Sequence, residues 1–280
     1  MIIFKHAEDL NRFLKSKRKQ GIIVGFVPTM GALHKGHISL IKESIRKNKL
    51  TVCSIFVNPL QFNDARDYEK YPITTEQDIL LLEESGCPVL FLPDVDEIYP
   101  NKKSNRKPGN VGVLEHVLEG AFRPGHFAGV YAVVRRLLEI VLPDNLYLGQ
   151  KDYQQYLVIK EMADKIFPSV SVISHPIIRE ISGLALSSRN RRLNETEIKK
   201  AVELNKSLEF VKKHISTSNW EMVKKEQIDK LEKKGFKVEY LELADRKTLK
   251  PSTKYNKEKK WVLLLAAWLG SVRLIDNIFL

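Results

Sequence analysis

Two histidines separated by two residues stand at the start of a candidate helix, in the run HKGH at 34–37. A strand pattern ends before them at Pro28, and the loop in between contains Gly31. The first N–H groups of a helix lack backbone partners and attract anions, and an imidazole can donate to a phosphate oxygen. Gly36 has no side chain, so an adenine or a ribose could lie against its backbone. The pattern predicts a nucleotide-phosphate site at this helix start.

Two other interpretations of the histidine pair are open. Both rings could belong to a capped turn and face water, with no ligand. A zinc site is less favoured, because no third cysteine, histidine or carboxylate follows at ligand spacing.

A second polar cluster is the run LSSRN at 186–190. Two hydroxyls and a guanidinium in a short turn can bind a polyphosphate, the guanidinium through paired hydrogen bonds. A helix cap leading into Arg191 and Arg192 explains the same residues, and this run taken alone favours the cap.

A third cluster, GQKD at 149–152, follows a strand pattern and begins a helix. Lys151 is a candidate cation for a phosphate, and Asp152 can cap the helix or hold a ribose or magnesium. A glycine turn with a capping aspartate explains Gly149 and Asp152 but leaves Lys151 without a role.

The elements that must position these residues alternate along the first two thirds of the chain. Strand-like apolar runs are 22–28, 51–57, 89–92, 145–148 and 171–173, and helical spacing occupies 39–47, 75–84, 130–141 and 154–167. This alternation predicts βαβ units and an α/β fold, a Rossmann-like doubly wound parallel sheet that binds ligands at the carboxyl ends of its strands.

The pattern changes near residue 176. Two lysine-rich helical stretches, at about 194–213 and 219–234, precede strand-like runs at 238–243, 261–268 and 272–275. We therefore expect a Rossmann-like ligand-binding domain at residues 1–175 and a smaller α+β domain at 176–280 that carries the Ser-Ser-Arg loop.

Composition narrows the class of protein. With 280 residues, 43% of them hydrophobic, and two cysteines, the chain is neither disordered nor a disulfide scaffold. The net charge of +12 suits a basic RNA-binding module. Most of the surplus, however, is scattered lysine in the last third with few aromatic neighbours, which favours a solvated face. Without a membrane-length apolar run, we expect a cytoplasmic protein and two buried thiols.

Several further motifs specify a family. An early HKGH helix start followed by a late Ser/Arg loop resembles the HIGH and KMSKS-like elements of the nucleotidylyltransferase superfamily. Further motifs, in chain order, are PTMGALHKGH at 28–37, FVNPLQF at 56–62, the Tyr71-Pro72 pair, EIYP at 97–100, LEGAFRPGHFAGV at 118–130, GQKDYQQ at 149–155, GLALSSRN at 183–190 and RLIDN at 273–277. Through these motifs the whole chain, in order, is similar to the pantothenate synthetase (pantoate–β-alanine ligase) family.

The resemblance implies an activity. Such enzymes use ATP, accompanied by Mg²⁺, to condense pantoate with β-alanine through a pantoyl adenylate, and they release AMP and pyrophosphate. It implies small-molecule substrates, a homodimer, and neither a nucleic-acid nor a membrane partner. Another HIGH-type adenylyl transferase is the alternative enzyme.

The resemblance also assigns residues. Gln61 would bind pantoate and β-alanine, and Gln155 would bind pantoate. His37 would be the proton donor, although we interpret it as a hydrogen-bond donor, because pyrophosphate barely needs protonation to leave at neutral pH. The residues assigned to ATP are Met30, Gly31, Ala32, Leu33, His34, Lys35, Gly36, His37, Gly149, Gln150, Lys151, Asp152, Ile178, Leu186, Ser187, Ser188 and Arg189.

Three positions stay open. Gln150 replaces a charged residue found in many relatives, and Ile73 replaces an arginine, so no charged function is carried over to either. His126, in the run RPGHF, could reach the pocket or support its own loop.

Overall fold

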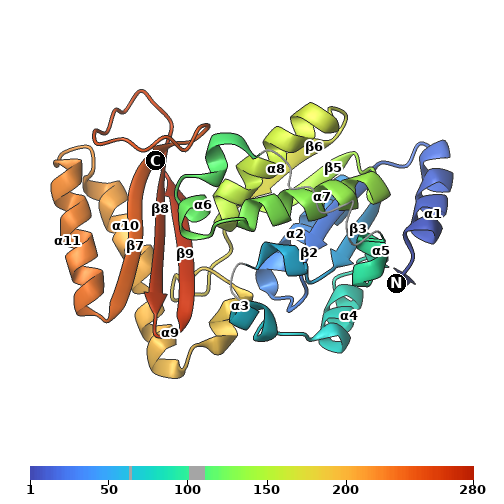
Figure 1. Ribbon diagram of the computed structural model, residues 1–280, viewed down its shortest axis with the longest axis horizontal. Helices are drawn as coiled ribbons and strands as arrows, with labels where there is room; N and C mark the ends of the chain where they lie inside the picture. The colour runs from blue at the N-terminus through green and yellow to red at the C-terminus, as the bar shows by residue number, and fades with distance from the viewer. Residues whose placement is uncertain (63–64, 101–110) are drawn as a thin grey trace. The chain divides into compact units, whose positions relative to one another are not determined.

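The computed structural model describes residues 1–62, 65–100 and 111–280. The chain forms two compact units (Figure 1). The first comprises Met1–Gly149 and Gln155–Pro176, and the second comprises Gln150–Gln154 and Ile177–Leu280.

The first unit contains a six-stranded parallel sheet with the order β1-β4-β3-β2-β5-β6. Its strands are β1 (Ile2–Phe4), β2 (Val24–Thr29), β3 (Leu50–Ile55), β4 (Val89–Phe91), β5 (Asn145–Gly149) and β6 (Ser171–His175). Strand order reverses between β2 and β5, and ligands of such sheets bind beyond the carboxyl ends at this point. The predicted α/β fold is confirmed, and β1 is an additional edge strand.

Helices lie on both faces of this sheet, since alternate strand residues point to opposite sides. Phe26 and Val52 pack in one hydrophobic cluster with residues of α1, α7 and α8, whereas Val27 and Cys53 pack in another with residues of α2 and α4. The helical elements are α1 (Ala7–Lys19), α2 (Lys35–Lys47), η1 (Pro59–Gln61), α3 (Ala65–Glu69), α4 (Thr75–Glu84), α5 (Val95–Ile98), η2 (Gly112–Glu115), α6 (Glu119–Phe122), α7 (His126–Val141) and α8 (Tyr153–Ile166).

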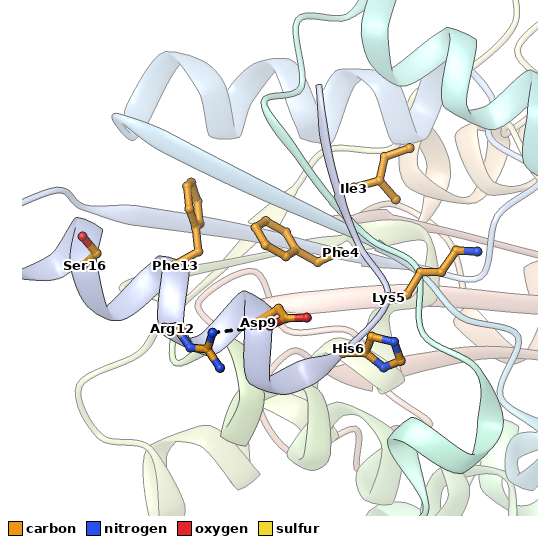
Figure 2. Close-up of a pocket in the computed structure, with 8 residues that line it drawn as sticks. All are labelled: Ile3, Phe4, Lys5, His6, Asp9, Arg12, Phe13 and Ser16. Atoms are coloured by element: carbon orange, nitrogen blue, oxygen red, sulfur yellow. Dashed lines mark ion pairs between the residues drawn. The ribbon is translucent and has the colours of Figure 1, made fainter.

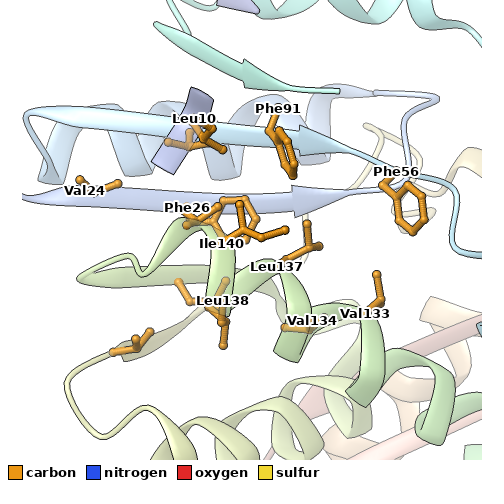
Figure 3. Packing of buried hydrophobic residues seen from close by; sticks show 14 of the residues in the cluster. Leu10, Val24, Phe26, Phe56, Phe91, Val133, Val134, Leu137, Leu138 and Ile140 are labelled. Carbon is orange, nitrogen blue, oxygen red and sulfur yellow. The ribbon is translucent and has the colours of Figure 1, made fainter. Parts of the chain in front are cut away.

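Aromatic residues of the central strands anchor the larger cluster. Phe26 of β2 and Phe91 of β4 are fully buried, together with Leu138 of α7 (Figure 3). Burying one such side chain stabilises the fold by roughly 1.5–3 kcal/mol. The cluster therefore holds β2, the strand that leads into the HKGH helix, on a rigid support.

The second unit is α+β, as predicted. Its helical elements are η3 (Gln150–Asp152), η4 (Ser188–Arg192), α9 (Glu195–Ala201), α10 (Glu203–His214) and α11 (Trp220–Lys233), and its antiparallel strands are β7 (Phe236–Asp245), β8 (Trp261–Leu269) and β9 (Val272–Phe279). A turn at Val202 divides the first lysine-rich stretch into two helices, where the sequence predicts one.

Both cysteines are buried thiols, which confirms the prediction. Burial raises the pKa of the Cys53 thiol well above its usual value and that of the Cys87 thiol to about 11. Both therefore stay protonated at neutral pH and serve as small apolar side chains.

A hollow of about 860 Å³ lies beside β1 and α1, where Ile3, Phe4 and Phe13 are its apolar lining and His6 and Arg12 are among its polar lining (Figure 2). It belongs to the edge strand, whereas the predicted site follows the central strand β2. Across the described part of the chain, no helix is both long and apolar enough to span a bilayer.

Candidate active site

The loop after β2 is held by a buried carboxylate from another helix. Gly31 and Ala32 both have left-handed backbone, with φ of +76° and +49°. Asp78 of α4, only 1% exposed, accepts the N–H groups of Ala32 and Leu33, each at 2.8 Å, and the Thr74 hydroxyl at 3.1 Å. Residues other than glycine rarely adopt a positive φ, so this conformation is unfavourable for Ala32. The two charge-assisted hydrogen bonds to Asp78 hold it in place.

Asp78 therefore holds the backbone of Ala32 and Leu33, two of the residues assigned to ATP. The side chains of Ala32 and Leu33 are buried, and their N–H groups point at this carboxylate. Their contribution is to fix the path of the loop toward His34.

Replacing Asp78 with alanine should lower the free energy of unfolding by roughly 2–4 kcal/mol, because two buried N–H groups lose a charged acceptor. Urea unfolding followed by circular dichroism measures this loss. Glu76→Gln, at an exposed position of the same helix, is the control and should change little. An unchanged midpoint for Asp78→Ala would show that the loop does not depend on this carboxylate.

The histidine pair forms a reciprocal cap at the start of α2. The Gly36 N–H donates to His34 Nδ1 at 3.1 Å, and the His34 N–H donates to His37 Nδ1 at 3.3 Å. The ring centroids lie 4.0 Å apart. Because each Nδ1 accepts, the proton of a neutral ring is on Nε2, which makes Nε2 the donor. The two Nδ1 atoms therefore form the cap, as the capped-turn interpretation expects. The two Nε2 atoms are the ones that could donate to a phosphate.

Gln61 contacts the same loop. It is 8% exposed, and its Nε2 lies 2.8 Å from the Met30 sulfur. Asn58 Nδ2 donates to Gln61 Oε1 at 3.2 Å and to the Gly129 carbonyl at 3.1 Å, and the Tyr99 hydroxyl donates to Asn58 Oδ1 at 2.9 Å. The structure therefore brings together Gln61, assigned to pantoate, and Met30, assigned to ATP.

His126 supports the turn that carries Gln61. Its Nδ1–H donates to the Gln61 carbonyl at 2.7 Å, and its Nε2 accepts from Arg123 at 3.0 Å. The helix α7 approaches this turn closely, since a Cβ on Gly129 would lie 2.2 Å from the Leu60 carbonyl oxygen. Of the two roles that the sequence allows for His126, these contacts favour support of the loop.

His175, at the end of β6, joins this strand to α2. Its Nε2 lies 2.7 Å from the hydroxyl oxygen of Ser39, two residues after His37. Burial lowers the pKa of His175, which favours the neutral ring. No sequence motif indicates this contact.

In the second unit, the turn Gln150–Asp152 is held by β9. Asn277 Nδ2 donates to the carbonyls of Gln150 and Lys151, both at 2.9 Å, and Gln150 Nε2 donates to Asn277 Oδ1 at 3.1 Å. Lys151 Nζ lies 3.4 Å from Asp152 Oδ1. The side chain of Gln150 thus has a structural partner, which explains why a neutral amide suits this position.

The Ser/Arg loop of the second unit lies next to Ile178 through backbone hydrogen bonds. The Leu186 N–H donates to the Ile178 carbonyl at 3.0 Å. Ser187 caps the short helix η4 by accepting the Arg189 N–H at 3.3 Å. The predicted cap is therefore present, and it places Ser188 and Arg189 in the first turn of η4.

The remaining assigned residues lie at the ends of elements. Lys35 begins α2 and is exposed, Gly149 ends β5, and the partly buried Gln155 is in the first turn of α8. Among the described residues, no group of three or more His, Cys, Asp or Glu side chains is arranged to hold a metal ion.

Comparisons with known proteins agree over the whole chain. The sequence model of the family described as Pantoate-beta-alanine ligase matches residues 2–279. Pantothenate synthetase of Cytophaga hutchinsonii is 43% identical, with 99% of each chain covered, and that of Aquifex aeolicus is 44% identical, covering 99% of this chain and 98% of the relative.

Two solved structures are similar as well. Pantothenate synthetase from Thermus thermophilus superposes with a TM-score of 0.91 at 38% identity, with 99% of both chains covered. Pantoate-beta-alanine ligase from Francisella tularensis, complexed with beta-gamma ATP and beta-alanine, superposes with a TM-score of 0.81 at 39% identity, covering 99% of this chain and 97% of that one.

Proposed function

This chain belongs to the pantoate–β-alanine ligase family, and on that premise we propose that it condenses pantoate with β-alanine through a pantoyl adenylate. The two half-reactions consume ATP and release pyrophosphate and AMP. Both nucleophiles are substrate groups, so the protein must bind, orient and stabilise charge.

In the first half-reaction, a carboxylate oxygen of pantoate attacks the α-phosphorus of ATP, and the bond from that phosphorus to the bridging oxygen breaks. Negative charge grows on the departing pyrophosphate, and fixed donors stabilise such charge without reorganisation. Nε2 of His34 and of His37 are the donors we assign here. The reciprocal cap supports this assignment, because it fixes both rings through Nδ1.

Gln61 is suited to bind pantoate because its present partner is weak. Thioether sulfur is a poor hydrogen-bond acceptor, so a carboxylate or hydroxyl oxygen of the substrate would replace Met30 at Nε2 with a gain. Asn58 and His126 hold Gln61 from the other side, so the amide is oriented before substrate arrives. Gln155 is the second amide assigned to pantoate.

In the second half-reaction, the amine of β-alanine attacks the acyl carbon of the adenylate, and the bond from that carbon to the phosphate oxygen breaks. AMP leaves, and the nitrogen releases one proton to solvent and keeps the other as the amide N–H. Gln61 takes part here too, because the family resemblance assigns it to both pantoate and β-alanine.

In the second unit, we assign Lys151 and Arg189 as cations for the phosphates, with Ser187 and Ser188 as neutral donors and Ile178 and Leu186 as backbone contacts. A lysine ammonium group binds phosphate as a point charge, and a guanidinium binds it through paired hydrogen bonds, so both side chains suit this role.

The residues present fit a magnesium ion that arrives with ATP. Mg²⁺ is commonly bound by one or two carboxylates together with substrate phosphates and water, so a preformed cluster is not required. Asp152, whose side chain is 48% exposed, is the carboxylate in the assigned set that could hold it. Such an ion would neutralise phosphate charge.

The single observation that carries the proposal is the 2.8 Å contact between Gln61 Nε2 and Met30 Sδ, which joins the residue assigned to the acyl substrate to the loop assigned to ATP. The test is exchange of labelled pyrophosphate into ATP with β-alanine absent. We expect exchange that requires pantoate, and AMP release that requires all three substrates. Exchange without pantoate would overturn the substrate assignment and favour another adenylyl transferase.

We also propose a homodimer, as the family resemblance implies. Light scattering after gel filtration should give twice the 32.2 kDa mass of one chain. A mass of one chain at micromolar concentration would contradict it.

A further inference from the structure

A buried ion pair in the second unit lies outside the residues assigned to any substrate. Arg179 donates through both terminal nitrogens to Asp276, at 2.6 and 2.8 Å, and Asp276 is only 4% exposed. Burial raises the pKa of Asp276, whereas Arg179 acts in the opposite direction. Asp276 and the residue after it belong to the RLIDN run, to which the proposed reaction assigns no part.

This pair fixes the neighbouring Asn277. Asp276 Oδ1 accepts the backbone N–H of Asn277 at 2.8 Å, and Asn277 is 2% exposed. Both hydrogens of its side-chain amide are used, one on the Gln150 carbonyl and one on the Lys151 carbonyl. Its Oδ1 accepts from Gln150 Nε2. The amide of Asn277 is therefore fully committed to the turn that carries Lys151.

Holding the backbone of the turn in this way affects the position of a flexible lysine side chain more than that of a rigid side chain. The four-carbon stem of Lys151 is flexible, so the position of its ammonium group depends on where the backbone starts the stem. Two hydrogen bonds to consecutive carbonyls hold both peptide planes of the turn. A displacement of about 1 Å in a group that stabilises transferring phosphate can cost about 100-fold in rate.

The same ion pair also reaches the Ser/Arg loop. Arg179 Nη1 donates to the Gly183 carbonyl at 3.2 Å, and Arg179 pairs with Ala185 in an isolated antiparallel bridge. Beside this bridge, the Leu186 N–H donates to the Ile178 carbonyl. One anchor thus holds three segments that the family resemblance assigns to ATP.

We infer that Asn277, held by Arg179 and Asp276, is a positioning residue that fixes Lys151 for phosphate binding. The inference rests on the proposed function, in which Lys151 binds phosphate. Asn277 acts through the two carbonyls and touches no substrate.

The test is a double-mutant cycle between Asn277→Asp and Lys151→Ala in the full-length protein. The aspartate has the shape of asparagine but places a carboxylate oxygen where Nδ2 donates to the two carbonyls, so both hydrogen bonds are lost. We expect kcat/KM for ATP to fall roughly 10- to 100-fold, with the KM for β-alanine unchanged. In the Lys151→Ala background, the same substitution should change kcat/KM by less than about twofold.

A matched control separates positioning from general stability. Glu239 of β7 and Arg273 of β9 form another ion pair in the second unit, at 2.7 Å, and both side chains are largely buried. Glu239→Gln should lower the melting temperature without changing kcat/KM for ATP. Asn277→Ser, which is small and keeps one donor, replaces Asn277→Asp in the cycle if the aspartate variant does not fold.

The outcomes distinguish the inference from the proposed function. A fall of equal size in both backgrounds would overturn the positioning role while Lys151 keeps its place. An unchanged rate in Lys151→Ala alone would remove Lys151 from the phosphate site and overturn the inference with it. If Asn277→Asp slows the enzyme that has Lys151 but does not slow the Lys151→Ala variant further, the inference and the proposed function are both supported.

Discussion

Replacing His37 with alanine should lower turnover by two or more orders of magnitude, about 3 kcal/mol of transition-state stabilisation. The reason is that His37 Nδ1 accepts the His34 N–H, which leaves Nε2 as the donor to the growing charge on pyrophosphate. Pantoate-dependent pyrophosphate exchange measures the effect directly, because it reports the first half-reaction alone.

Alanine also removes one half of the helix cap, so a second variant is needed. In His37→Asn the amide oxygen can still accept the His34 N–H, but nothing replaces Nε2. We therefore expect His37→Asn to unfold near the wild-type temperature and still to be slow. His6→Asn is the control, since His6 is the N-cap of α1 but its side chain makes no cap hydrogen bond. A folded His37→Asn protein with wild-type exchange would remove His37 from the reaction.

Most of the parallel sheet could be predicted because its strands are continuous apolar runs separated by helical spacing. The sequence pattern does not predict the edge strand β1, because it has only three residues, and Ile2 and Ile3 are 49% and 43% exposed. Nor does it predict the helix α1, because only Leu10 and Leu14 are buried along its length. Short or sparsely buried elements are stabilised by contacts with neighbouring elements, and the periodicity of the local sequence gives no information about those contacts.

The side chains expected at the site were predictable where motif and chemistry coincide, as at the histidine pair and Gln61. Their supports were not, because these contacts cross long stretches of chain. Asp78 is 46 residues from Ala32, and Asn277 is 126 residues from Lys151. One signal was available for Asp78: it stands four residues before the buried Leu82, so it lies on the apolar face of α4. An acid on an apolar face needs a partner.

The structure gives the turn that carries Lys151 specific support. The turn is held by Asn277 through two carbonyls, and the side chain of Lys151 is only 17% exposed. Its ammonium group pairs with the neighbouring Asp152, with Nζ 3.4 Å from Oδ1. Contact with one half-exposed carboxylate is weak, so a phosphate with higher charge can compete for this ammonium group.

Lys151→Ala should therefore lower turnover by two or more orders of magnitude, because the positive charge that we propose binds the ATP phosphates is lost. If the charge acts mainly in the transition state, kcat falls more than the KM for ATP rises. Lys151→Met, which keeps the stem but not the charge, should be as slow as alanine. Lys160→Met on α8 is the control, since Lys160 pairs with Asp164 on the surface at 2.9 Å and should be dispensable. Steady-state AMP release at saturating ATP measures all three variants, and a Lys151→Met enzyme within about threefold of wild type would show that the charge is not needed.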